Sequence, residues 1–165
     1  MFIVFEGIDG SGKSTQIFLL AKHLASLDKH IHILLTREPY KNREIREILK
    51  QNESPELRKE KLTELFIQDR KEHISDMILP NLDKRVIVIS DRYKYSTIAY
   101  QGAQGQDINN LIEAQKDFPI PDFVFIIDTD VKTAFERMQK DSRTEQKFEK
   151  SYFFQDKVRK NYLKL

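Results

Sequence analysis

The stretch from Phe2 to Thr15, FIVFEGIDGSGKST, gives the clearest indication of the fold of this chain. A short apolar run leads straight into a glycine-rich loop, and the loop ends on Lys13 and Ser14, in the pattern G-x-x-x-x-G-K-[ST]. A buried strand, such a loop and a helix start, in this order, form a cradle whose backbone N–H groups surround a phosphate. Lys13 is expected to place its charge on the β- and γ-phosphates, and Ser14 to offer a hydroxyl to Mg²⁺. The stretch therefore predicts a site for a nucleoside triphosphate.

Further apolar runs predict the rest of a sheet. With Phe2–Phe5, the runs Ile31–Leu35, Val86–Ile89 and Phe123–Ile127 are continuous rather than alternating, as in parallel strands covered on both faces. The helices expected between and after them are Ser14–Leu27, Arg43–Lys50, Pro55–Leu79, Ser96–Gln104, Ile108–Lys116, Val131–Gln139 and Lys150–Leu163. Strands that alternate with helices predict an α/β fold of the three-layer P-loop NTPase type, a parallel sheet of about four strands with helices on both faces.

The length and composition fit one compact domain spanning residues 1–165. The chain has no cysteine, which excludes disulfides, cysteine-ligated zinc and thiol catalysis. No apolar run approaches the ~20 residues that cross a bilayer, and the first residues lack the basic region of a secretory signal. We therefore expect a cytoplasmic protein with no membrane partner.

The charges nearly cancel, since 28 Lys and Arg face 26 Asp and Glu, and this balance gives no indication of a nucleic-acid partner. Residues 130–165 nevertheless hold ten Lys or Arg and six Asp or Glu. This surplus suits either a cationic segment that closes over an anion site or a solvated helical face. The polar stretch Asp141–Lys147 predicts a short lid at about residues 140–149.

Charged residues end or follow the predicted strands, at the edge where ligands of open parallel sheets gather. Asp91 follows the third apolar run and is the preferred carboxylate near the metal, and Asp128, at the end of the fourth, competes with it. The alternative for Asp128 is a helix N-cap shared with Asp130. Arg37 and Arg92 come just after strands and suit an anionic second substrate held in line with the γ-phosphate; the alternative for each is a surface ion pair.

The chain lacks the guanine-reading N-K-x-D motif of switch GTPases, and its strand-end arginines favour a small-molecule kinase. Its motifs resemble those of the thymidylate kinases, P-loop enzymes that move the γ-phosphoryl group of ATP to dTMP. The matching stretches are Phe5–Thr15, Thr36–Pro39 (TREP) and Asp91–Gly102 (DRYKYSTIAYQG), of which the third is the most specific. Phe66 and Arg70 have the i,i+4 spacing of the family's base-reading pair, which places both on one helix face. The resemblance covers nearly the whole chain.

The resemblance implies a role for each matching residue. Phe66 would stack on thymine, Arg70 would donate to its O4, and Thr97 would reach its N3 edge. Tyr100 would lie under the sugar and leave no room for a 2′-OH, although on their own Phe66 suits a core position and Tyr100 a helix contact. The implied sets are, for dTMP, Asp9, Arg37, Phe66, Arg70, Arg92, Ser96, Thr97, Tyr100 and Gln101; for ATP, Gly7, Asp9, Gly10, Ser11, Gly12, Lys13, Ser14, Thr15 and Arg137; for Mg²⁺, Ser14 and Asp91; and for catalysis, Lys13, Asp91, Arg92 and Arg143.

The chain also departs from the family pattern. Some members carry arginine at the position of Gly10, so positive charge is expected instead from the lid, with Arg143 first and Lys147 where the family often has arginine. Tyr40 follows the TREP motif, where many members have small residues. Members usually continue past the position of Leu165 with a fifth strand and a last helix, whose connecting loop helps to wall the adenine. The family is usually homodimeric, and a homodimer is expected here.

Two other functions stay open at this point. A deoxynucleoside kinase would use Glu38, in the pair Glu38-Pro39, as the base that deprotonates the 5′-OH of thymidine. Arg37, Arg92 and the Phe66–Arg70 pair instead suit an acceptor that already bears a phosphate. The second alternative is a nucleotide-binding remnant that binds but does not transfer.

Overall fold

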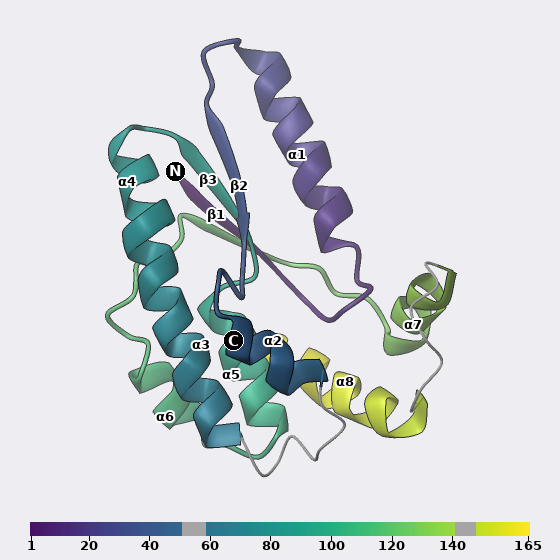
Figure 1. Ribbon diagram of the computed structural model, residues 1–165. Helices are drawn as coiled ribbons and strands as arrows, with labels where there is room; N and C mark the ends of the chain where they lie inside the picture. Colours follow the sequence, from purple (N-terminus) through teal and green to yellow (C-terminus); the bar gives the residue numbers. More distant parts are fainter. Residues whose placement is uncertain (51–58, 141–147) are drawn as a thin grey trace.

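The computed structural model describes residues 1–50, 59–140 and 148–165 (Figure 1). In these ranges β1 (Phe2–Glu6), β2 (Ile33–Arg37), β3 (Ile87–Asp91) and β4 (Phe123–Ile126) form one parallel sheet in the order β2-β3-β1-β4. The predicted α/β class and the parallel sheet are confirmed. The second and third strands end two residues later than expected, so Arg37 and Asp91 are the last strand residues rather than the first loop residues.

Helices follow each strand. They are α1 (Lys13–Leu27), α2 (Arg43–Lys50), α3 (Lys59–His73), the π-helical η2 (Ile74–Ile78), α4 (Leu79–Asp83), α5 (Lys94–Ala103), α6 (Ile108–Glu113), α7 (Val131–Lys140) and α8 (Phe148–Tyr162). A long helix was expected over 55–79, and its expected start lies outside the described residues. From Lys59 it runs as α3, passes through the π-helical turn η2 and ends with α4 at Asp83. None of the described helices is long and apolar enough to cross a membrane.

Alternate side chains of β1 point to opposite faces of the sheet, which explains its continuous apolar run. On one face Ile3, Phe5 and Ile89 pack with Ile17 of α1. On the other face Phe2, Val4 and Val88 pack with Ile74 and Ile78 of η2. Figure 1 shows α1 and the α3–η2–α4 rod on opposite sides of the sheet. Each fully buried side chain of this kind contributes about 1.5–3 kcal/mol, so β1 anchors both layers.

The edge strand β4 differs from the expectation of burial on both faces. Phe123 and Phe125 stack on one another and remain 52% and 43% exposed. They lie on the face of the sheet opposite to the one that η2 covers. Phe125 also stacks on Phe5 of β1. The exposed aromatic pair is visible only from the structure, because periodicity does not tell a central strand from an edge strand.

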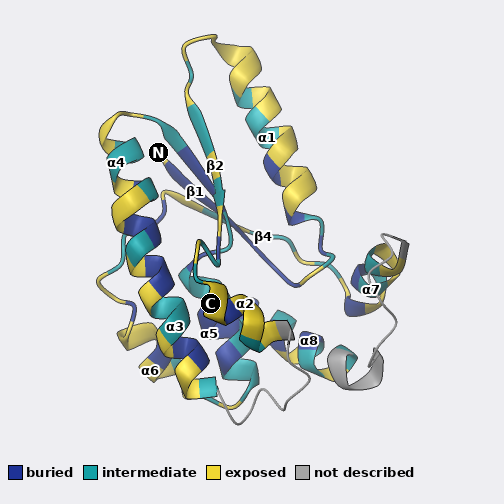
Figure 2. Ribbon diagram, in the orientation of Figure 1, coloured by how far each residue is buried: buried dark blue, intermediate teal, exposed yellow. Residues whose placement is uncertain are grey.

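A third cluster holds the phosphate loop against the helices beyond the sheet. Ile8 of the loop packs with Val131 and Ala134 of α7, Ala99 of α5 and Val158 of α8. Figure 2 shows dark-blue, buried segments on α5 and α7. The strand register places Phe5 opposite Asp91, and Asp91 opposite Arg37. The phosphate loop and the carboxyl ends of β2 and β3 therefore lie at the same end of the sheet.

Candidate active site

The phosphate loop between β1 and α1 depends on glycine for its shape. Gly7, Gly10 and Gly12 all have positive φ values, of 140°, 76° and 102°. A Cβ on Gly7 would lie 2.7 Å from the carbonyl oxygen of Ile127, and one on Gly10 would overlap the carbonyl oxygen of Ala134. Arginine at position 10, as in some thymidylate kinases, therefore has no room here unless α7 moves. The glycine is a consequence of how closely α7 approaches the loop.

Lys13 lies folded across this loop. Its ammonium group donates to the carbonyl oxygens of Gly7 at 3.0 Å and Ile8 at 2.8 Å. The side chain is buried, and burial, with the nearby charge of Arg92, lowers the pKa of Lys13 to about 8. Desolvation disfavours the charged form, so an incoming anion would stabilise the ammonium group. The loop thus holds a cation whose electrostatic environment favours a phosphate.

The carboxylate nearest Ser14 comes from the end of β3. The Ser14 hydroxyl donates to Oδ2 of Asp91 at 3.3 Å, and Oδ1 of Asp91 is buried with no partner among the described residues. Asp128, its competitor, forms an ion pair with Arg159 at 2.9 Å instead. The cap at the start of α7 is Asp130, which accepts from the backbone of Thr133 at 2.9 Å. The geometry therefore favours Asp91 over Asp128.

Arg92 stands at the centre of the acceptor side. Its backbone is left-handed, with φ 75°, a strained conformation for a residue with a Cβ and one that clusters at functional sites. One guanidinium nitrogen donates to Ser96 at 3.0 Å and to the Tyr162 hydroxyl at 3.1 Å. The other donates to Asp9 of the phosphate loop at 2.7 Å and to Tyr100 at 3.2 Å. Arg92 thus links the phosphate loop to α5 and α8.

Glu6 is a residue that the sequence reasoning missed. It ends β1 with its carboxylate fully buried, accepting from the backbone N–H groups of Tyr93 and Ser96 and from the hydroxyls of Ser96 and Tyr162. Burial raises the pKa of Glu6 to about 7, against the opposing effect of these hydrogen bonds and of Arg92. The sequence feature that could have identified Glu6 is its place as an acidic residue directly after a buried apolar run. Glu6 holds the start of α5, and through Tyr162 and Ser96 it supports Arg92.

The second predicted arginine is not part of this assembly. The Arg37 side chain is 75% exposed, and its nearest charged partner is Asp91 at 3.9 Å. Arg37 nevertheless lies next to Asp91 at the carboxyl ends of the paired strands β2 and β3. The loop that follows is held firmly, because Asp69 of α3 accepts the backbone N–H groups of Tyr40, Lys41 and Asn42.

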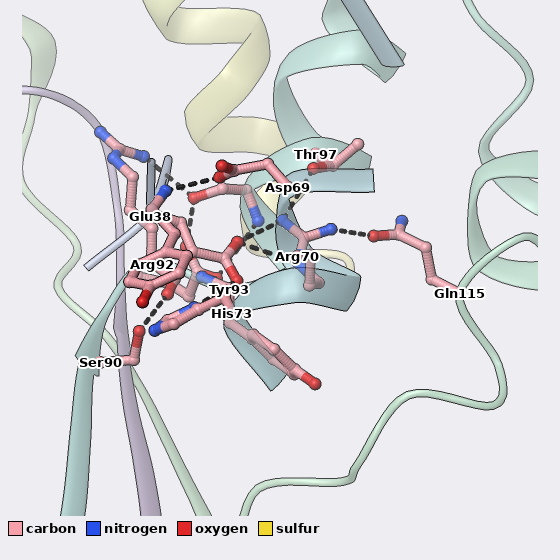
Figure 3. Close-up of polar contacts among 12 residues, drawn as sticks. Glu38, Asp69, Arg70, His73, Ser90, Arg92, Tyr93, Thr97 and Gln115 are labelled. Atoms are coloured by element: carbon pink, nitrogen blue, oxygen red, sulfur yellow. Dashed lines mark hydrogen bonds and ion pairs between the residues drawn. The ribbon is translucent and has the colours of Figure 1, made fainter. Parts of the chain in front are cut away.

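The proposed base-reading residues lie on α3 and α5. Phe66 is half-buried and belongs to none of the three buried clusters. Arg70 is almost fully buried and contacts Glu38, Thr97 and Gln115, as Figure 3 shows. Gln115 was not expected, since it lies after α6 and far from Arg70 in the sequence.

The sugar-side residues lie on α5. The Tyr100 ring lies 5.1 Å from the Arg92 guanidinium carbon, and burial raises the pKa of Tyr100 to about 12. Gln101 is buried and donates to Gln104 at 3.2 Å, while its Oε1 has no partner among the described residues. That α5 borders the acceptor stays a prediction.

The last predicted contacts concern α7 and the lid. Arg137 donates to the carbonyl oxygen of Ser11 at 3.0 Å, which places its guanidinium beside the phosphate loop. Thr129, which was not predicted, donates to the same carbonyl at 3.1 Å. Thr15 is exposed in the first turn of α1. Arg143, Lys147 and most of the predicted lid at 140–149 lie outside the described residues.

Comparison with known proteins supports a nucleotide-binding site at the phosphate loop. The family model for thymidylate kinase matches residues 5–165. The chain belongs to the thymidylate kinase family. The "probable thymidylate kinase" of Pyrococcus horikoshii is 43% identical over 171 residues, which cover 99% of this chain and 82% of that one. The thymidylate kinase of Thermosipho africanus is 40% identical over 172 residues, covering 100% of this chain and 84% of that one.

A solved structure supports the fold. The crystal structure of thymidylate kinase from Ehrlichia chaffeensis matches with a TM-score of 0.69 and 39% identity, over 85% of this chain and 82% of that chain. The P-loop fold and the family predicted from the three motifs are therefore confirmed. Membership of the thymidylate kinase family makes the protein a nucleoside monophosphate kinase with ATP as its phosphate donor. The roles of single residues stay predictions.

Proposed function

We propose that the protein transfers the γ-phosphoryl group of ATP to dTMP, giving ADP and dTDP, as a step in the synthesis of dTTP. The observation that carries this proposal is the junction of two anion-binding elements. Asp9 of the phosphate loop contacts Arg92, at the end of the neighbouring strand, at 2.7 Å. Two nucleotides bound to these elements would meet at their phosphate ends, as in-line transfer requires.

On the donor side, ATP would lie along the loop from Gly7 to Thr15, with its phosphates on the backbone N–H groups and the start of α1. Lys13 would exchange its two carbonyl partners for phosphate oxygens. Arg137, held at the carbonyl oxygen of Ser11, would face the same phosphates. Arg143 and Lys147, in a lid at about 140–149, are proposed to supply the remaining positive charge when ATP is bound.

The residues at the end of β3 fit Mg²⁺. A hard cation takes oxygen ligands and in nucleotide sites needs only one or two from the protein, so a larger acidic cluster is not required. The described residues contain no such cluster of three or more possible ligands. The Ser14 hydroxyl and the unpartnered Oδ1 of Asp91 are of the right type. When bound, Mg²⁺ would neutralise negative charge that develops on the phosphates during transfer.

On the acceptor side, Arg92 and Arg37 would hold the phosphate of dTMP, and Asp9 would accept a hydrogen bond from the 3′-OH. Tyr100, Ser96 and Gln101 of α5 would border the sugar. Phe66 would stack on thymine, with Arg70 and Thr97 at its polar edge. The Arg37 side chain extends into solvent, whereas Arg92 already contacts Ser96 and Tyr100 of α5.

The chemistry needs no strong base, because the attacking oxygen belongs to a phosphate that is already ionised. Glu38 is poorly placed to act as one. Its Oε2 accepts from Arg70 and its Oε1 from His73, and the side chain is buried. These hydrogen bonds use both oxygens of the Glu38 carboxylate. This arrangement supports a monophosphate acceptor over thymidine itself.

The remaining expectations are part of the same proposal. We propose a single catalytic domain that acts as a homodimer in the cytoplasm and takes ATP and dTMP as its small-molecule substrates, with no nucleic-acid or membrane partner. The remnant reading is disfavoured because Lys13, Ser14, Asp91 and Arg92 are all present and close to one another.

The test is a steady-state assay of ADP formation with ATP and Mg²⁺, with dTMP and thymidine compared as acceptors. We expect turnover with dTMP and none above background with thymidine. Lys13→Met should abolish turnover while the protein stays folded, as judged by its circular dichroism. Turnover of thymidine alone would indicate a deoxynucleoside kinase. The absence of turnover with either acceptor would favour a nucleotide-binding remnant that does not transfer a phosphoryl group.

A further inference from the structure

We propose that Glu38 is a positioning residue for base recognition, and that it acts by fixing the guanidinium group of Arg70. Glu38 follows β2, whereas Arg70 lies in the last turn of α3, and the two meet in the interior (Figure 3). Nε and Nη2 of Arg70 donate to Oε2 of Glu38 at 2.9 and 2.5 Å. The exposed fractions of the two side chains are 1% and 5%. The proposal rests on the proposed function, in which Arg70 contacts the base of dTMP.

Glu38 is itself held in one orientation. His73, one turn after Arg70 on α3, has its Nδ1 at 3.1 Å from Oε1 of Glu38. Because a carboxylate only accepts, His73 donates through Nδ1, and its Nε2 lies 2.7 Å from the hydroxyl of Thr36 on β2. The Tyr40 ring stacks on the imidazole with centroids 4.9 Å apart. The chain Thr36–His73–Glu38 therefore leaves the carboxylate no freedom to turn away from Arg70.

The other partners of Arg70 complete the restraint. Nη2 also donates to the Thr97 hydroxyl at 3.0 Å, and Nη1 donates to Oε1 of Gln115. The amide of Gln115 cannot flip without loss, because its nitrogen donates to the carbonyl oxygen of Leu111 at 2.9 Å. The Tyr93 ring lies 5.4 Å from the guanidinium carbon. Four of the five N–H bonds of an arginine are thereby used.

One N–H of Nη1 is left without a partner among the described residues. It is the only donor of Arg70 that a base could use without breaking an existing hydrogen bond. A single fixed donor suits an acceptor such as the O4 of thymine and meets a donor-to-donor conflict with the 4-amino group of cytosine. Glu38 thus serves specificity, since without its carboxylate the guanidinium could rotate and offer its other N–H bonds.

The experiment measures KM for dTMP, KM for ATP, kcat and the equilibrium Kd for dTMP in the full chain. The variants are Glu38→Gln, Arg70→Met and the double variant, with Glu72→Gln as the matched control. Glu72 lies on the same helix and its carboxylate pairs with the surface residue Lys41 at 3.2 Å. Glu38→Gln keeps the shape of the side chain and removes the charge. Glu38→Asp, which keeps the charge and shortens the side chain, replaces it if the amide variant does not fold.

We expect Glu38→Gln to raise both KM and Kd for dTMP at least tenfold, with KM for ATP within twofold of wild type. Glu38→Asp should have a smaller effect in the same direction, and Glu72→Gln should have none. If Glu38 acts through Arg70, Glu38→Gln should change the Kd for dTMP less than twofold when Arg70 is already methionine.

Three results would overturn the inference while the proposed function stands. They are wild-type affinity for dTMP in Glu38→Gln despite a lower melting temperature, equal loss of affinity for ATP and dTMP, and independent, multiplicative effects of the two substitutions on Kd. The absence of dTMP turnover in the wild-type chain would instead overturn the proposed function, and the inference with it.

Discussion

The buried carboxyl of Glu6 makes the stability of this protein depend on pH in a direction that can be worked out. Burial raises its pKa from 4.5 to about 7. Between these two values the folded protein holds a proton that the unfolded chain has released, so folding is favoured by low pH in this window. The contribution of Glu6 to stability therefore decreases as the pH rises from about 4.5 through about 7, and it is constant above that.

The size of the effect follows from the same numbers. One pKa unit corresponds to 1.36 kcal/mol, so the difference between 4.5 and about 7 is worth roughly 3 kcal/mol. For a chain of 165 residues this corresponds to about 6–12 °C in Tm. Lys13, whose pKa is lowered to about 8, remains protonated in both states at pH 5–7 and does not oppose the trend there.

Glu6→Gln removes the titration and keeps the contacts. The amide oxygen can accept from the backbone N–H groups of Tyr93 and Ser96, and the amide nitrogen can donate to the hydroxyl oxygens of Ser96 and Tyr162, which rotate to accept. The variant therefore resembles the protonated protein at every pH. Relative to wild type, it should gain roughly 3 kcal/mol of stability between pH 4.5 and 8.

The assay is urea unfolding followed by circular dichroism at steps between pH 4.5 and 8, with wild type, Glu6→Gln and the exposed control Glu113→Gln measured side by side. The difference between Glu6→Gln and wild type should rise with pH and level off above pH 7, while the control stays parallel to wild type. Parallel curves for Glu6→Gln and wild type would refute the reasoning, since they would mean that Glu6 titrates alike in the folded and unfolded states.

Three further outcomes follow from the site. Tyr162→Phe removes a hydroxyl that contacts Glu6, Ser96 and Arg92, and should cost about 1.5–3 kcal/mol in urea unfolding and lower kcat, whereas Tyr93→Phe, whose hydroxyl has no partner among the described residues, should cost less than half as much. Gly10→Ala combines a φ of 76° with an overlap on α7, and should lower stability by about 1–3 kcal/mol and weaken ATP binding in calorimetry; unchanged ATP affinity would contradict this. Asp91→Asn should raise the Mg²⁺ concentration for half-maximal activity at least tenfold, with Asp128→Asn as the unaffected control, and equal effects of the two would count against the assignment of Asp91.

The parts of the fold that the sequence predicts are those set by local pattern. The glycine-rich loop between a buried strand and a helix needs no distant partner to be recognised, and it predicts the fold class, which the structure confirms, and a donor site. The preference for Asp91 over Asp128 also agrees with the geometry, because parallel strands bring their ends to one edge.

The contacts between distant segments are what the pattern does not contain. Glu38 and Arg70 are 32 residues apart, and nothing in either neighbourhood indicates that a carboxylate just after a strand turns inward to meet the last turn of α3. The sequence shows Glu6 only as the last residue of a strand. The structure adds that Tyr162, near the far end of the chain, donates a hydrogen bond to it. The half-exposed Phe123 likewise depends on which strand forms the edge of the sheet.

The measurement that bears most directly on the junction of the two nucleotide sites uses a bisubstrate compound, adenosine and thymidine joined through five phosphates. If the phosphate loop and the Arg92 corner hold the two phosphate ends side by side, the compound should inhibit competitively against both ATP and dTMP. Its affinity should fall in Lys13→Met and in Arg92→Met alike. Competition against only one substrate, or loss of affinity in only one of the two variants, would contradict the account.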